Sequence, residues 1–102
     1  MHPVIESQRE ALSELCRRWG VRRLEVFGSA SRNDFDEDRS DIDFLVEFDD
    51  AADNATLADF FELKEALEKL FARPVDLVMP TAIRNPYIRA SINRSRQLVY
   101  GT

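Results

Sequence analysis

Apolar residues along this 102-residue chain recur at two spacings, and the alternation between the spacings predicts the order of helices and strands. Between residues 3 and 19 the spacing is helical, and Gly20 is a typical helix stop. RRLEVFG (22–28) and DIDFLVEF (41–48) are short, strongly apolar segments that predict two strands. The second strand is the more apolar, so we expect both of its faces to be covered.

The alternation continues through the middle of the chain. DDAADNA has the composition of a loop, and Asn54 or Thr56 can cap a helix that runs to about residue 71. The apolar residues of this helix recur on one side, which we expect to face the core. Pro74 then precedes VDLVM, which predicts a third short strand.

The end of the chain predicts one more helix. Asn85 and Pro86 are a typical cap and first turn, with Ile88 and Ile92 expected to face inward, and QLVY follows as a short extended end. The whole order predicts one α/β (α+β) domain over residues 1–102. We expect a mixed three- to four-stranded sheet with flanking helices.

Charge is unevenly distributed along the chain. The net charge is −5, but residues 77–102 contain four arginines and no acid, which leaves a net −9 on the first 76 residues. Direct binding of nucleic acid by charge alone is therefore not favoured. The basic end could contact phosphate or an acidic partner, or it could pair with the acidic body, and the sequence leaves these alternatives open.

The N-terminal residues and the single cysteine indicate a compartment. MHPVIESQRE lacks the basic and apolar regions of a signal peptide, and no apolar run approaches the ~20 residues that span a bilayer. Cys16 has no second cysteine with which to form an internal disulfide. We therefore expect a cytoplasmic protein that does not engage membranes.

Two aspartates at the start of the second strand are candidates for chemistry. Asp41 and Asp43 should point to the same face, about 7 Å apart along the backbone. Adjacent carboxylates repel each other, and Mg²⁺ removes this conflict because it prefers carboxylate and phosphate oxygens. The alternative is two exposed acids at the entrance of a strand, joined to a solvated loop.

Further residues can join this pair if the strands are arranged suitably. Gly28 and Ser29 end the first strand, where backbone N–H groups and a hydroxyl can approach a phosphate. Asp76 lies among apolar residues near the start of the third strand. With the first two strands antiparallel and the third parallel to the second, all these residues would meet at one end of the sheet.

The segment GSASRNDFDEDRSDIDFLVEF resembles the nucleotidyltransferase signature, which has Gly-Ser, about a dozen residues, Asp-x-Asp and a third acid on a later strand. It is closer still to the minimal nucleotidyltransferases, the MNT antitoxin-like proteins, whose signature is similar to GS-x-A-R-G-D…S-D-I-D-L-L-V. Arg32 and Asp34 match this pattern, whereas Asn33 replaces its usual Gly and Ser31 replaces a common small residue.

The resemblance implies a fold like the palm of DNA polymerase β and assigns roles to residues. Asp41, Asp43 and Asp76 would be catalytic and hold Mg²⁺, with two ions in the active complex. Gly28, Ser29 and Arg32 would bind the nucleotide. The reaction implied is transfer of a nucleoside monophosphate, expected to be AMP from ATP, to a hydroxyl with release of pyrophosphate.

The resemblance also implies a partner. Members of the family are often paired with a HEPN-domain toxin, which they neutralise as antitoxins, in some systems by adding AMP to it. The alternative is a catalytically silent antitoxin that neutralises its partner by binding alone. The sequence leaves open whether the chain forms a homodimer or a hetero-oligomer.

Overall fold

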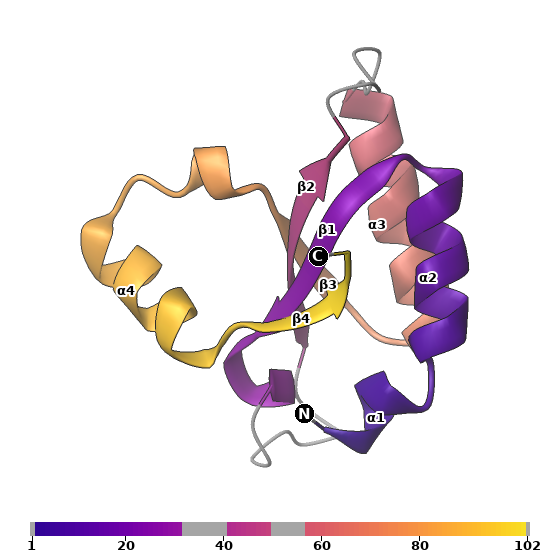
Figure 1. The fold of residues 1–102 in the computed structure, drawn as a ribbon, viewed down its shortest axis with the longest axis horizontal. Helices are drawn as coiled ribbons and strands as arrows, with labels where there is room; N and C mark the ends of the chain where they lie inside the picture. Colours follow the sequence, from indigo (N-terminus) through magenta and orange to yellow (C-terminus); the bar gives the residue numbers. More distant parts are fainter. Residues whose placement is uncertain (1, 32–40, 50–56, 102) are drawn as a thin grey trace.

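The computed structural model describes residues 2–31, 41–49 and 57–101. In chain order the elements are α1 (Pro3–Glu6), α2 (Arg9–Arg18), β1 (Val21–Phe27), the 3-10 turn η1 (Gly28–Ser31), β2 (Ile42–Phe48), α3 (Leu57–Phe71), β3 (Val75–Val78), the 3-10 turn η2 (Pro80–Ala82), α4 (Pro86–Ser95) and β4 (Gln97–Tyr100) (Figure 1). This arrangement confirms the predicted α+β domain. The expected loop with its two candidate caps, Asn54 and Thr56, lies outside the described residues.

The strands form one mixed sheet in the order β3-β2-β1-β4. β1 is antiparallel to β2 and β4, and β3 is parallel to β2, with α3 as the crossover between β2 and β3. With these strand directions, the Gly28 turn and the aspartates were expected to meet at one end of the sheet. Its register places Phe27 of β1 opposite Asp43 of β2, and Asp43 beside Asp76 of β3.

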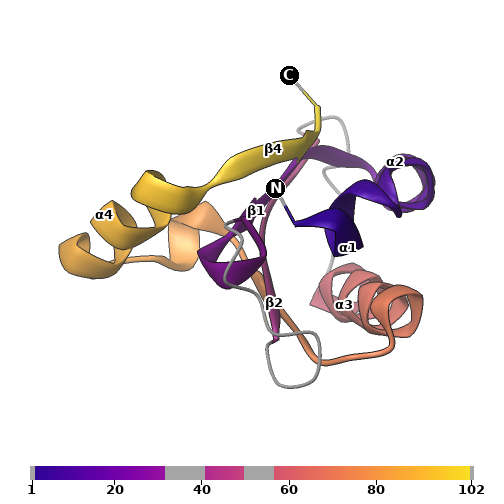
Figure 2. The same ribbon diagram turned by 90° about the horizontal axis from the view of Figure 1, so that it is seen from below.

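The helices lie in two groups on opposite sides of the sheet. α1, α2 and α3 cover one face, whereas α4 extends from the other side (Figures 1 and 2). Alternate residues of β2 point into the first group, and Ile42, Phe44 and Val46 are fully buried there. Leu45, on the opposite face of β2, is also buried. The expected burial of both faces of this strand is therefore confirmed at its centre.

The single helix predicted over residues 3–19 is wrong in one respect, because the structure divides it into α1 and α2. Ser7 lies at the break, where its hydroxyl donates to the carbonyl oxygen of Val4 (3.2 Å). Such a local bond competes with helix continuation. Cys16 is fully buried as expected, and burial raises the pKa of its thiol to about 12, so the thiol stays protonated. No described helix is both long and apolar enough to cross a bilayer.

α4 begins as the sequence predicted but faces inward less than expected. The Asn85 side-chain oxygen accepts from the backbone N–H groups of Tyr87 (2.9 Å) and Ile88 (3.4 Å). Ile92 is buried, whereas the expectation for Ile88 is wrong, since 54% of its surface is exposed. α4 extends from the sheet, so the core covers only the end of the helix that leads into β4 (Figure 2).

Candidate active site

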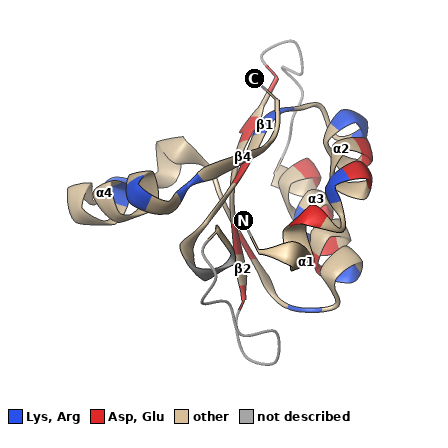
Figure 3. Cartoon of the chain, turned by 60° about the horizontal axis from the view of Figure 1, so that its bottom comes forward, with Lys and Arg blue, Asp and Glu red and all other residues tan. Residues whose placement is uncertain are grey.

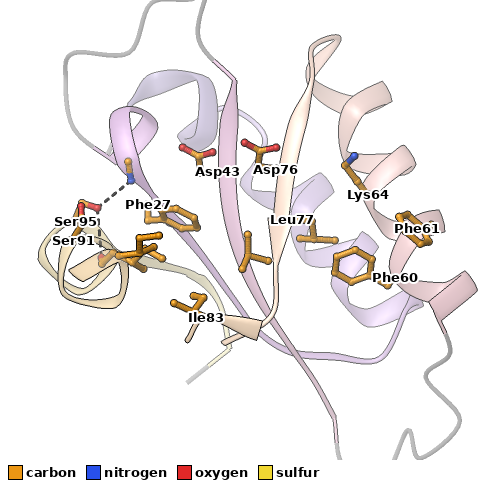
Figure 4. Close-up of a pocket in the computed structure, with 14 residues that line it drawn as sticks. Phe27, Asp43, Phe60, Phe61, Lys64, Asp76, Leu77, Ile83, Ser91 and Ser95 are labelled. Carbon is orange, nitrogen blue, oxygen red and sulfur yellow. Dashed lines mark hydrogen bonds between the residues drawn. The ribbon is translucent and has the colours of Figure 1, made fainter. Parts of the chain in front are cut away.

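The site is built around two aspartates on neighbouring parallel strands. Asp43 and Asp76 are register partners on β2 and β3, and their side chains can share a hydrogen bond when one of them is protonated. Both line a cavity of about 570 Å³ at the end of the sheet (Figure 4). The strand order therefore brings together two residues that are 33 positions apart in the sequence.

The electrostatics of this pair favour a bound cation. Burial, the hydrogen bond with Asp76 and the negative charges of Asp76 and Asp41 raise the pKa of the Asp43 carboxyl from 3.8 to about 6, with burial the largest cause. A divalent cation between the two carboxylates would cancel their repulsion. Hard carboxylate oxygens are also the ligands that Mg²⁺ prefers, so this donor set fits the ion.

Asp41 lies at the margin of the site. It is exposed and precedes the first residue of β2, and its charge is felt at Asp43. Within residues 2–31, 41–49 and 57–101, no three His, Cys, Asp or Glu side chains gather closely enough to form a ready metal site. The structure thus brings together two of the three expected acids, and the three-ligand set stays a prediction.

Gly28 fits closely against Asp43. Its φ of +72° suits glycine, and a Cβ at this position would lie 2.7 Å from Oδ2 of Asp43. The glycine lines the same cavity and opens η1, in which the Ser31 hydroxyl donates to the Gly28 carbonyl oxygen (2.8 Å). The two parts of the signature therefore meet in space. The side chain of Ser29 and all of Arg32 lie outside what the structure describes.

The walls of the cavity include residues that the sequence analysis did not assign to the site. One wall comes from Ile83 and α4, where the Ser95 hydroxyl accepts from the Gly28 N–H (3.0 Å) (Figure 4). The opposite wall comes from α3 and includes Phe60, Phe61 and Lys64. The sequence carries one weak signal for this wall, since Lys64 lies one helical turn after Phe60 and so shares its side of the helix.

Two of the four C-terminal arginines, Arg89 and Arg96, contact other parts of the chain. Arg96 pairs with the buried Glu25 of β1 (3.2 Å), and Arg89 donates to the carbonyl oxygens of Ile83 and Pro80. Arg96 thus attaches the C-terminal segment to the sheet, whereas Arg89 makes contacts within that segment. Figure 3 shows basic but no acidic positions on α4, whereas the sheet and α3 carry both acidic and basic positions.

Comparisons with known proteins agree with this geometry. The sequence profile of the nucleotidyltransferase domain family matches residues 8–99. Protein adenylyltransferase MntA of Thermococcus cleftensis is 40% identical over 87 residues, which cover 85% of this chain and 81% of the relative.

Solved structures give the same picture. A structure named provisionally as a minimal nucleotidyltransferase is 38% identical, with a TM-score of 0.75 and 95% coverage of both chains. A chain from the complex of tri-AMPylated Shewanella oneidensis HEPN toxin with MNT antitoxin is 21% identical and shares the fold, with a TM-score of 0.66 and coverage of 96% of this chain and 73% of that one. The chain therefore belongs to the nucleotidyltransferase domain family and is a nucleotidyltransferase of the minimal kind.

Proposed function

We propose that the chain is a Mg²⁺-dependent protein adenylyltransferase that transfers AMP from ATP to a hydroxyl of a partner protein. One observation carries the proposal: the Gly28 turn is seated directly against the Asp43–Asp76 pair in a single cavity. A turn that can approach phosphates and a pair of carboxylates that suits a divalent cation are the two parts that this transfer needs. The name of the Thermococcus relative supports the choice of AMP and of a protein acceptor.

The proposed roles rest on the positions of the three aspartates and Gly28, and for Ser29 and Arg32 on the signature alone. Asp43 and Asp76, with Asp41 at the margin, would hold Mg²⁺, and the backbone of Gly28 with Ser29 and Arg32 would hold the β- and γ-phosphates. When bound, Mg²⁺ would stabilise the charge on the attacking and leaving oxygens.

In the transfer itself, the acceptor oxygen forms a bond to the α-phosphorus while the bond from that phosphorus to the bridging oxygen of pyrophosphate breaks. The hydroxyl proton passes to a carboxylate of the site, with Asp76 the expected acceptor-side group.

We propose further that the chain acts as the antitoxin of a HEPN-type toxin. The complex of a HEPN toxin with an MNT antitoxin, to which the fold is similar, supports this choice of partner. The C-terminal segment offers a surface for docking: Tyr87 is 84% exposed, and Arg84 and Arg94 form no ion pair with another described residue. Exposed aromatic and arginine side chains are enriched at protein interfaces.

A binding-only antitoxin is the second candidate. It is favoured by the same exposed face of α4, which could dock a partner without any transfer. The two candidates make opposite predictions for the carboxylates, because binding alone has no need of the Asp43–Asp76 pair.

The test uses α-labelled ATP, Mg²⁺ and, as candidate partner, the product of the neighbouring gene. We expect the wild type to label the partner, and Asp43→Asn with Asp76→Asn to lower the rate at least ~1,000-fold, since metal ions supply several kcal/mol of charge stabilisation. ATP with Mg²⁺ should also raise the Tm of the wild type but not of the double variant. A partner that is bound and neutralised equally by both proteins, without label, would establish the binding-only candidate instead.

A further inference from the structure

Lys64 has an unusual position relative to the carboxylates. Of the described residues that line the cavity, it alone is basic. It is half-buried on α3, and Figure 4 shows its nitrogen turned toward β3, on the Asp76 side of the carboxylate pair. No salt bridge joins it to another described residue, whereas Lys69 on the same helix pairs with Glu65 (3.5 Å). A charge held in the cavity without such a pairing is available to a substrate.

The order of the strands shows which part of a substrate Lys64 would meet. Gly28 follows β1, Asp43 is on β2 and Asp76 is on β3. Figure 4 shows the Lys64 side of α3 next to β3, on the side away from Gly28. In phosphoryl transfer the attacking and leaving oxygens lie roughly in line on opposite sides of the phosphorus. With the pyrophosphate held at Gly28, the attacking hydroxyl must approach from the side of β3 and α3.

We propose that Lys64 is the acceptor-side positioning residue, whose ammonium attracts the oxygen that attacks the α-phosphorus. This inference rests on the proposed function, because the direction of approach depends on the triphosphate lying at Gly28. A positive charge close to a hydroxyl favours its ionised form. Lys64 keeps its own proton throughout, and the proton of the acceptor passes to a site carboxylate as before.

Two phenylalanines complete this wall. Phe60 and Phe61 line the cavity beside Lys64 with their rings edge to face, 5.4 Å between centroids, and 55% of Phe61 is exposed. An acceptor that presents its hydroxyl to Lys64 would rest its apolar part on Phe61. The wall thus selects a hydroxyl carried on an apolar group.

The test compares Lys64→Met and Lys64→Arg with Lys69→Met as a matched control on the same helix. The probe acceptor is N-acetyl-tyrosinamide, with α-labelled ATP and Mg²⁺ as donor. We expect Lys64→Met to lower kcat/KM for the acceptor at least ~10-fold and to move the rate-limiting ionisation to higher pH, while the Kd for ATP stays within ~2-fold. Lys64→Arg should retain most of the rate, and Lys69→Met should match the wild type.

Two results would overturn the inference. Unchanged transfer by Lys64→Met would remove Lys64 from the reaction, and an equal loss of ATP affinity and of transfer would place it on the triphosphate instead. Both results leave the proposed function intact, because the wild type still transfers AMP. A wild type that binds ATP but transfers AMP neither to this probe nor to the partner protein would overturn the proposed function, and this inference with it.

Discussion

The two sides of the active-site cavity are held in place by different forces. The sheet side rests on β2, an interior strand whose neighbours pair with it on both edges and whose Phe44 is fully buried. The α4 side has one buried residue, Ile92, and is held largely by polar contacts such as Ser95 with Gly28 and Arg96 with Glu25. The core therefore fixes Asp43, with Asp76 paired beside it on the edge strand β3, whereas the position of α4 depends on a few contacts that a partner could replace.

This difference suggests a division of labour. A metal and a triphosphate need ligands held to within a fraction of an ångström, which a packed strand provides. A protein partner can tolerate, and even use, an element with weaker attachment. Substitutions on one side should therefore leave the function of the other side intact.

Gly28→Ala should damage the sheet side most. The added Cβ would meet Oδ2 of Asp43 at 2.7 Å, and the positive φ disfavours alanine. Displacing a carboxylate by an ångström can cost ~100-fold in rate, and the backbone strain costs about 1 kcal/mol or more of stability. Transfer kinetics and thermal unfolding measure both effects.

Gly20→Ala is the matched control, since Gly20 also has a positive φ, of 67°, but lies at the other end of β1. It should lose similar stability and keep its ATP affinity. Equal loss of ATP affinity in both variants would show that general destabilisation, rather than the contact with Asp43, explains the effect at Gly28.

Reversing the charges of Arg84 and Arg94 to Glu should weaken the α4 side as a docking surface. We expect association with the HEPN-domain partner to slow about tenfold at low salt and less at high salt, because exposed charges act mainly on the rate of encounter. ATP affinity should not change. Arg89 is unsuitable for this test, because its side chain holds backbone carbonyl groups of the same segment.

A control with the same change of net charge is Arg17→Glu with Lys69→Glu, on helices that cover the opposite face of the sheet. Stopped-flow association at two salt concentrations distinguishes the pairs. If both pairs slow the encounter equally, the effect comes from net charge, and α4 has no special role in docking.

In the absence of metal, the pH dependence of the free energy of unfolding should reveal the cost of ionising Asp43 beside Asp76. The pKa of Asp43 is raised from 3.8 to about 6 in the folded state. Between about pH 4 and pH 6 the folded state therefore holds a proton on Asp43 that the unfolded state has lost. The free energy of unfolding should therefore be highest below about pH 4 and fall as the pH rises toward 6. We expect a loss of about 1 kcal/mol, since solvent screens this half-buried group.

Asp43→Asn should remove this dependence and make the metal-free domain more stable than the wild type at pH 7. Chemical denaturation in the presence of a chelator, at pH 4, 5, 6 and 7, measures the effect. A variant that is less stable than the wild type at every pH would show that the Asp43 carboxylate stabilises the domain rather than straining it.

Ser95→Ala removes the hydrogen bond that joins the α4 side to the Gly28 turn on the sheet side. Its effect on stability should be small. Loss of the hydroxyl leaves the Gly28 N–H without its partner, at a cost of about 1 kcal/mol. Hydrogen exchange should become faster in α4 and stay unchanged in β2. Ser95→Thr, which keeps a hydroxyl, is the control, and faster exchange throughout both elements in Ser95→Ala would argue against a local attachment.

The sequence predicted the sheet side well, for a physical reason. The strand segments were apolar, a helix long enough for a crossover allows a parallel neighbour, and the register then places Asp43 beside Asp76. The Asn85 cap was also predictable, because it depends on residues only two and three positions away.

The features that the sequence missed depend on distant or competing contacts. The bond between Gly28 and Ser95 spans 67 positions, and no local pattern encodes it. Ile88 has a helical spacing typical of a core residue, yet its burial depends on where α4 lies in space. The break at Ser7 is accompanied by a local side-chain hydrogen bond, which the apolar spacing does not reveal.

The register of Asp43 beside Asp76 also has a consequence for how the chain folds. β2 and the parallel strand β3 are separated by α3, so they can pair only after this connection has closed. Such non-local pairing is slow, because the chain loses the entropy of loop closure before the new contacts stabilise it. The Asp43–Asp76 pair thus forms only once α3 and β3 are in place. Bound ATP and metal should accordingly slow unfolding while leaving the rate of folding unchanged.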